Sequence, residues 1–262
     1  QLQVTVHETH VALQAQLRRA PDRLDIVAEL QRALMTVGRF QEVITLADDV
    51  QAALAAAPEG KPPYASLDPL PWVQNLHASA LGALGKFDDS ATRLAAASRL
   101  QESGGSNVSQ TLNLAHLYVT LGRPDDALAT TASAGTNLSD YGRMAKAAIE
   151  HGAHLLKGDA AAAAKAMAYL REHRADAEAI YLAALVEAGD IDEAAGNLVA
   201  RLSSQDERAE ALYELQDFND LPPKPGSERY EANWEKLEDH PQVRAAVADV
   251  GRFIDIDLYW AD

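Results

Sequence analysis

The sequence contains no cysteine, which excludes disulfide bonds, thiol nucleophiles and thiolate metal ligands within it. It also lacks an apolar run close to the ~20 residues that cross a bilayer, so no membrane span is expected. Aromatic residues make up only 6% of the chain, and runs rich in Val, Ile, Thr and Tyr are nearly missing before the final residues. Alanine and leucine are abundant instead, and they favour closely packed helices. We therefore expect an all-α protein.

Basic residues are few relative to acidic ones. There are 23 Lys and Arg against 39 Asp and Glu, which gives a formal net charge of −16. A surface with this charge repels phosphate groups, and no basic stripe compensates for it, so nucleic acid is not an expected partner. The acidity is typical of a large solvated surface that must stay soluble, and it is also compatible with a cationic peptide or a basic partner protein.

Catalytic and metal-binding motifs are lacking as well. There is no G-x-S-x-G elbow, and SGGSN at 103–107 has neither the lysine nor the spacing of a phosphate-binding loop. His7 and His10 in HETH invite comparison with the zinc-protease motif, but the second histidine comes one residue too early and two ligands are too few. We expect a surface histidine pair there. The sequence thus predicts no enzyme, no metal and no cofactor.

Five glycines each separate an alanine- and leucine-rich run from a short polar turn. They are Gly38, Gly85, Gly122, Gly158 and Gly189, in the strings GRFQEV, GKFDDS, GRPDDA, GDAAAA and GDIDEA. A glycine suits the left-handed position that ends a helix, and in the third string proline and two aspartates suit the first turn of the next one. A helix–turn–helix unit cannot bury its apolar face alone, so the units should stack into a solenoid.

The clearest of these units spans residues 111–134 and carries a recognisable pattern. The matching residues are Ala115, Tyr118, Gly122 and Ala127 in this unit, and Gly85 with Phe87 and Gly38 with Phe40 in two others. Over roughly residues 22–203 the chain resembles the tetratricopeptide-repeat (TPR) proteins, in particular the bacterial TPR-like helical repeat proteins. The resemblance implies a right-handed α-α superhelix. Because the glycine intervals of 47, 37, 36 and 31 residues vary, the superhelix should be irregular.

The expected organisation has three parts: an N-terminal helix at 1–21, helical repeats at 22–219, and a C-terminal cap with an extended tail at 220–262. The proline-rich insert at 58–71 should form a loop, which either lengthens a turn or crosses the groove.

Within the C-terminal part, Tyr230, Trp234 and Leu237 indicate a helix, and Asp239 should cap the one that follows. The alternating residues near the end predict an extended segment. This segment either covers the end of the array or forms a docking tail.

The TPR resemblance also implies where a partner would bind, because the first helix of each unit lines the concave groove in that family. The positions that face the groove here are Arg32, Met35, Trp72, Asn75, Ser79, His116 and Thr120. The same positions are equally compatible with ordinary helix surface. Chaperone-binding members of the family hold a peptide carboxylate with a Lys and an Asn, and the corresponding pairs here are Ala28/Arg32, Asn75/Ser79 and Leu112/His116. This clamp is missing, so an acidic C-terminal peptide is not an expected ligand.

His151 and His154 fall at the packing positions of the fourth unit by the same register. We expect them to pack between helices, with a ring N–H bonded to a carbonyl oxygen, and not to bind a metal.

The resulting prediction is a non-enzymatic scaffold that binds a peptide or protein segment in the groove. The alternative is a structural or regulatory repeat domain of a larger protein whose activity lies in a missing N-terminal part. Since the sequence starts at Gln1 without an initiator Met or a signal peptide, we expect a processed or truncated product. A periplasmic location is slightly favoured over a cytoplasmic one, and no oligomeric state is predicted.

Overall fold

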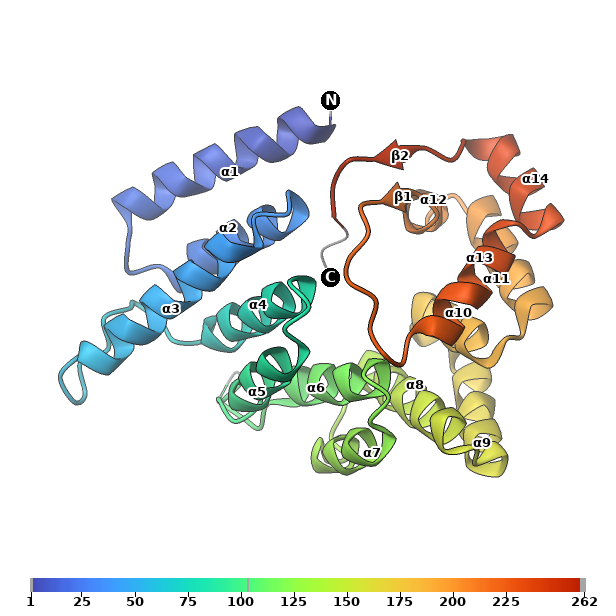
Figure 1. Cartoon of the computed structure of the whole chain (residues 1–262), viewed down its shortest axis with the longest axis horizontal. Helices are drawn as coiled ribbons and strands as arrows, with labels where there is room; N and C mark the ends of the chain where they lie inside the picture. Colours follow the sequence, from blue (N-terminus) through green and yellow to red (C-terminus); the bar gives the residue numbers. More distant parts are fainter. Residues whose placement is uncertain (1, 103, 260–262) are drawn as a thin grey trace. The chain divides into compact units, whose positions relative to one another are not determined.

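The computed structural model describes residues 2–102 and 104–259, with side chains from residue 8 onward. Helices make up 70% of it, which confirms the all-α prediction (Figure 1). The helices are α1 (Leu2–Arg19), α2 (Leu24–Thr36), α3 (Phe40–Ala56), α4 (Leu70–Ala83), α5 (Phe87–Ala97), α6 (Val108–Thr120), α7 (Pro124–Ser133), α8 (Asp140–Lys157), α9 (Ala160–Glu172), η1 (Arg174–Asp176), α10 (Glu178–Ala188), α11 (Ile191–Ser203), α12 (Arg208–Glu214), α13 (Glu228–Glu238) and α14 (Pro241–Val250). Two short strands, β1 (Asp217–Phe218) and β2 (Asp255–Ile256), pair with each other.

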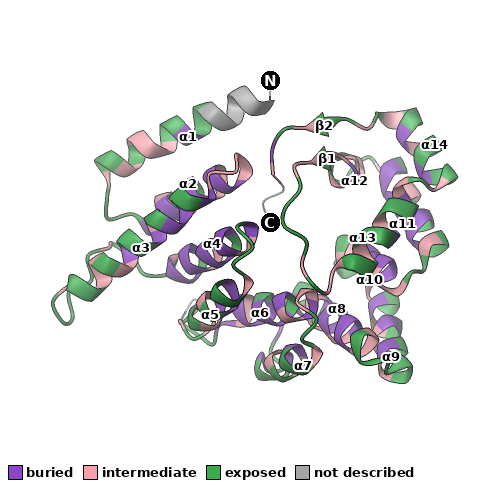
Figure 2. Ribbon diagram, viewed as in Figure 1, coloured by how far each residue is buried: buried purple, intermediate pink, exposed green. Residues whose placement is uncertain are grey.

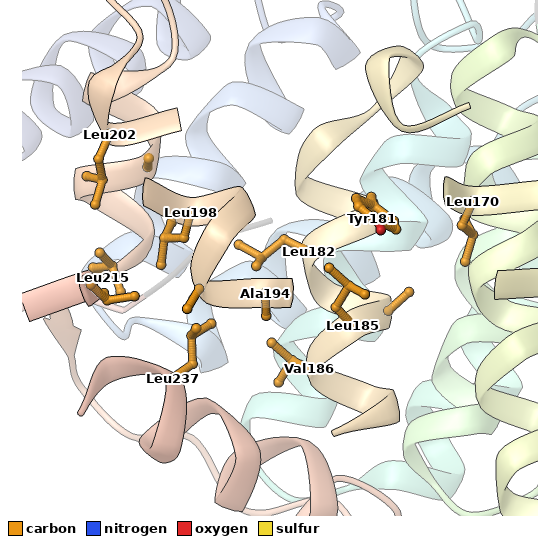
Figure 3. Packing of buried hydrophobic residues seen from close by; sticks show 14 of the residues in the cluster. Leu170, Tyr181, Leu182, Leu185, Val186, Ala194, Leu198, Leu202, Leu215 and Leu237 are labelled. Atoms are coloured by element: carbon orange, nitrogen blue, oxygen red, sulfur yellow. The ribbon is translucent and has the colours of Figure 1, made fainter. Parts of the chain in front are cut away.

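The chain divides into two compact units. Unit 1 comprises Gln1–Gln110, Phe218–Pro222 and Ile256–Asp262, and unit 2 comprises Thr111–Asp217 and Pro223–Asp255. In unit 1 the apolar faces of α2, α3 and α4 form the core, and α4 is the most completely buried of these helices (Figure 2). In unit 2 the leucines of α10 and α11 meet those of α9, α13 and the chain after α12 (Figure 3).

Five helix pairs are joined by the glycine turns that the sequence predicts. The pairs are α2/α3, α4/α5, α6/α7, α8/α9 and α10/α11, joined at Gly38, Gly85, Gly122, Gly158 and Gly189. Each of these glycines has a φ between 69° and 85°, a left-handed conformation in which a Cβ would be strained. The prediction of repeated helix–turn–helix pairs is therefore confirmed.

Three of the pairs share one buried hydrogen bond at equivalent positions. In each, a side chain on one helix bonds a backbone carbonyl on the other, and the two residues are 12 positions apart. The bonds run from Gln31 Nε2 to Val43 O (3.1 Å), from Ser90 Oγ to Ala78 O (2.7 Å) and from His151 Nδ1 to Ala163 O (2.9 Å). The predicted packing role of His151 is thus confirmed, whereas His154 lies with Nδ1 3.7 Å from Asp159 Oδ2.

The C-terminal part differs from the prediction at the start of α14. Between residues 204 and 219 only α12 is helical, and the next helical residues begin at Glu228. Asp239 does not cap α14; the N-cap is His240. The reason is that Asp239 still has right-handed helical backbone angles at the end of α13, and its carboxylate accepts a 2.6 Å bond from Arg244 Nη2. Beyond α14 the chain is extended as predicted, and Trp260 lies outside the described residues.

Two stretches from the C-terminal part of the chain belong to unit 1, and they pack on its glycine turns. We call the chain that follows α12 the returning chain. The Tyr259 N–H donates a 2.8 Å bond to Thr36 O, and its ring lies over Gly38. The same ring meets Phe40 edge-on, with 5.0 Å between ring centroids. A second turn, at Gly85, has the ring of Pro222 as its neighbour. Because glycine has no side chain, each turn leaves space for a residue of the returning chain, Tyr259 at Gly38 and Pro222 at Gly85.

In unit 2 the returning chain also packs on glycine turns. The Gly226 N–H donates a 2.8 Å bond to Thr120 O, next to the turn at Gly122. Further along, Asn233 lies beside Gly189 and its Nδ2 donates a 2.9 Å bond to Val186 O. The last carbonyl of α6 thus gains a partner that its own helix cannot provide, and Val186 O of α10 gains a second donor besides the Gly189 N–H.

Candidate functional site

The guanidinium group of Arg32 on α2 lies over the ring of Trp72 on α4, on the surface of unit 1. The guanidinium carbon of Arg32 lies 5.9 Å from the centre of the Trp72 ring, and the indole is 37% exposed. Arg32 also donates a 2.6 Å bond from Nη1 to Glu29 Oε1, one turn earlier on α2. The attraction between a cation and an aromatic ring and this ion pair together orient Arg32 over the indole.

Asn75 and Ser79 extend this surface along α4. They follow Trp72 at the third and seventh positions, so the three residues share one face of the helix. Ser79 is exposed and Asn75 is half-buried. We call Arg32, Trp72, Asn75 and Ser79 the Arg32–Trp72 patch. Met35 does not belong to it, because its side chain is only 5% exposed and is part of the unit 1 core.

The other two predicted site residues, His116 and Thr120, lie on the part of α6 that belongs to unit 2. His116 is exposed, whereas Thr120 is half-buried and its hydroxyl donates a 3.0 Å bond to Leu117 O. The Thr120 carbonyl accepts the bond from Gly226. Thr120 therefore has a clear role in attaching the returning chain.

The histidines of the HETH string do not form the expected surface pair. His10 is only 5% exposed, and its Nε2 lies 2.8 Å from Arg39 Nη1. The side chain of His7 lies outside the described residues. Within the described part of the chain, no group of three or more His, Cys, Asp or Glu side chains could hold a metal ion. No helix described there is long and apolar enough to cross a membrane.

A second candidate site is a cavity of about 520 Å³ in unit 2. We call it the α10–α11 cavity, because its walls come mainly from these two helices and from the turn η1 that precedes them. It is lined by Arg174, Glu178, Tyr181, Glu193, Gly196, Asn197, Ala200, Arg201 and Glu207. It is an open depression of the surface, because Arg174, Glu193, Gly196 and Ala200 in its lining are exposed.

Glu193 is held in the cavity wall as a carboxylate whose charge is already balanced. Arg171 donates to it from Nε (2.9 Å) and Nη2 (2.7 Å), and the Tyr181 hydroxyl also donates to it. These bonds lower the pKa of Glu193 to about 2. Burial and the bond to Glu193 raise the pKa of Tyr181, so the phenol stays protonated at neutral pH.

Arg201 is likewise balanced by Glu214. Its Nη1 and Nη2 donate bonds of 2.7 and 2.8 Å to the two carboxylate oxygens, and Arg201 is only 3% exposed. Burial opposes the charge of Arg201, but the bonds and the attraction to Glu214 outweigh it and raise its pKa. Among the described residues, Arg201 Nε has no hydrogen-bond partner.

Asn197 contributes a second unused polar atom. Its Nδ2 donates a 2.6 Å bond to Glu178 Oε2, while its Oδ1 has no partner in the described part of the structure. Sequence reasoning missed this site, because its residues come from three elements without any motif. The one available signal was Gly196, a glycine inside a helical pattern.

Comparison of the chain with protein-family models, curated proteins and solved structures finds no match. Support for a function therefore comes from the chemistry of the Arg32–Trp72 patch and of the α10–α11 cavity.

Proposed function

We propose that this protein is a non-enzymatic interaction module that binds a peptide or protein segment on the Arg32–Trp72 patch. The observation that carries the proposal is the exposed indole of Trp72 with the guanidinium group of Arg32 over it. Trp and Arg are enriched among the residues that dominate binding energy at protein interfaces. An arginine held over the ring also limits the conformations of both side chains before binding, which lowers the entropic cost of forming a complex.

The repeated helix pairs support the same proposal. In a right-handed TPR-like superhelix, α2 and α4 would be the first helices of their pairs and would face the concave groove. The patch combines an apolar ring with a cation and with the polar groups of Asn75 and Ser79. It therefore suits a segment with one large apolar side chain and an exposed backbone, to which amide and hydroxyl groups can hydrogen-bond.

Selection of peptides from a random phage-displayed library tests this proposal. Peptides selected on the wild-type chain are measured by isothermal titration calorimetry against wild type and Trp72→Ala. We expect Trp72→Ala to weaken binding at least ten-fold, since truncation of an interface hot spot costs about 2 kcal/mol or more.

Tyr141→Ala is the matched control, because Tyr141 is an exposed aromatic residue of unit 2 (63% exposed) and lies outside the patch. It should leave the affinity unchanged. A library that yields no binder, or binders that Trp72→Ala holds as tightly as wild type, would refute the patch as the docking site.

A further inference from the structure

The glycine turn between α8 and α9 lacks the neighbour that the other four glycine turns have. The returning chain lies against each of the others, at Gly38, Gly85, Gly122 and Gly189. At Gly158, within the described part of the chain, no atom outside the adjoining residues lies within 4 Å of an added Cβ. Residues 156–160 are all exposed. The fold therefore leaves this turn open.

The turns at Gly38, Gly122 and Gly158 have the same backbone hydrogen bonds. In each, the glycine N–H donates to the carbonyl three residues earlier, and the following N–H donates to the carbonyl five residues earlier. The carbonyl two residues before the glycine is left without a donor from its own helix. At two of the turns this carbonyl accepts a 2.8 Å bond from the returning chain. These bonds run from Tyr259 N–H to Thr36 O and from Gly226 N–H to Thr120 O.

The equivalent carbonyl at the open turn is that of Leu156. The N–H of Ala160, four residues further on, donates instead to Gly158 O at 3.1 Å. The Leu156 side chain is 40% exposed. Ala160 is also exposed, and it takes the position that Phe40 has in the first turn. The open turn thus presents the same acceptor beside two exposed apolar side chains.

Tyr259 shows which kind of segment this geometry accepts. Its N–H pairs with the open carbonyl, and its ring lies where a Cβ on Gly38 would be. We propose that the Gly158 turn docks an extended segment of another protein through a tyrosine, whose N–H donates to Leu156 O and whose ring lies over Gly158. This site lies within unit 2 and does not depend on the Arg32–Trp72 patch, so either proposal can fail without the other.

Selection from phage-displayed heptapeptides with tyrosine fixed at the centre tests the proposal. The library is first depleted on immobilised Gly158→Asn and then selected on the wild-type chain. Asparagine tolerates the left-handed conformation, so this variant should keep the turn, which circular dichroism checks, while its side chain covers the site. We expect selected peptides to bind Gly158→Asn about ten-fold more weakly or worse by calorimetry. A selection without binders, or binders that Gly158→Asn holds as tightly as wild type, would overturn the site.

Gly135→Asn is the matched control. Gly135 also has a positive φ and open space around it, but it lies in the loop before α8, so affinity should not change. Trp72→Ala should have no effect either, which separates this site from the Arg32–Trp72 patch. If either variant weakens binding as much as Gly158→Asn does, the turn is not the site.

A change in the peptide tests the predicted hydrogen bond without altering the protein. Methylation of the tyrosine nitrogen removes the N–H donor and should weaken binding by about ten-fold or more. A methylated peptide that binds as tightly as its parent would overturn the proposed mode of docking.

Discussion

Replacing Gly226 by alanine adds one methyl group where two stretches of backbone nearly touch. A Cβ at this position would lie 2.6 Å from Gly122 N, 2.7 Å from Val119 O and 2.9 Å from Thr120 O. All three are backbone atoms, at the end of α6 and in the turn that follows it, so they cannot move aside as a flexible side chain can. The substitution therefore forces the returning chain away from the turn.

The expected change in the free energy of unfolding combines two destabilising contributions and one stabilising contribution. Overpacking a well-fitted contact costs about 1–3 kcal/mol. Weakening the bond from Gly226 N–H to Thr120 O removes a further ~0.5–1.5 kcal/mol. Alanine restricts the unfolded chain more than glycine does, which returns about 0.4–1 kcal/mol. We expect the free energy of unfolding to fall by roughly 0.5–4 kcal/mol.

Urea unfolding followed by far-ultraviolet circular dichroism measures this change, and hydrogen exchange at the Gly226 amide shows whether the loss is local. Gly196→Ala is the matched control, since it adds the same methyl group inside a helix without a clash. That variant should be more stable than wild type by about 0.5–1 kcal/mol. If Gly226→Ala unfolds within about 0.5 kcal/mol of wild type, the close approach is not a constraint on the fold and the reasoning fails.

Three further outcomes are expected. Glu214→Ala leaves the charge of Arg201 buried and unpaired, which should cost about 3–5 kcal/mol; thermal unfolding measures it, and an unchanged midpoint would contradict it. The pKa of Glu193 is lowered from 4.5 to about 2, so its stabilisation is present above pH 4.5 and lost as the pH falls toward 2. Since its side chain is 43% exposed, that stabilisation should stay below about 1 kcal/mol, and Glu193→Gln should lose correspondingly less stability in acid. Burial lowers the pKa of His151 below 6.5, so stability should fall as the pH drops below 6.5. His151→Gln, which copies the contact of Gln31, should fold and show a flatter pH profile in urea unfolding, and an unchanged profile would contradict this.

The features that could be predicted from the sequence are those set by neighbouring residues. A glycine between a helix and a polar turn indicates a left-handed backbone conformation at that residue. All five of these turns occur where predicted. The packing of His151 follows from the same register, because its partner Ala163 lies on the paired helix. Local chemistry and the period of the repeat are enough for these features.

Contacts between distant residues could not be predicted in this way. His10 is buried beside Arg39, and nothing in the HETH string indicates this. Asp239 fails as a cap because the preceding helix continues to it. The register placed Met35 toward the groove, whereas its side chain fills the core. Arg32 and Trp72 do meet, but their contact depends on how α2 packs against α4.

The attachment of Tyr259 to the first glycine turn has a consequence for the order in which the protein folds. Thr36 and Tyr259 lie near opposite ends of the sequence. Their hydrogen bond therefore joins residues that are far apart along the chain. Synthesis proceeds from the N-terminus, and domains generally begin to fold while the chain is still being made. The pair α2/α3 can form early. The contact between the rings of Phe40 and Tyr259 cannot form until residue 259 has left the ribosome. A ribosome that stalls before this point therefore holds unit 1 unfinished, with apolar surface accessible to chaperones.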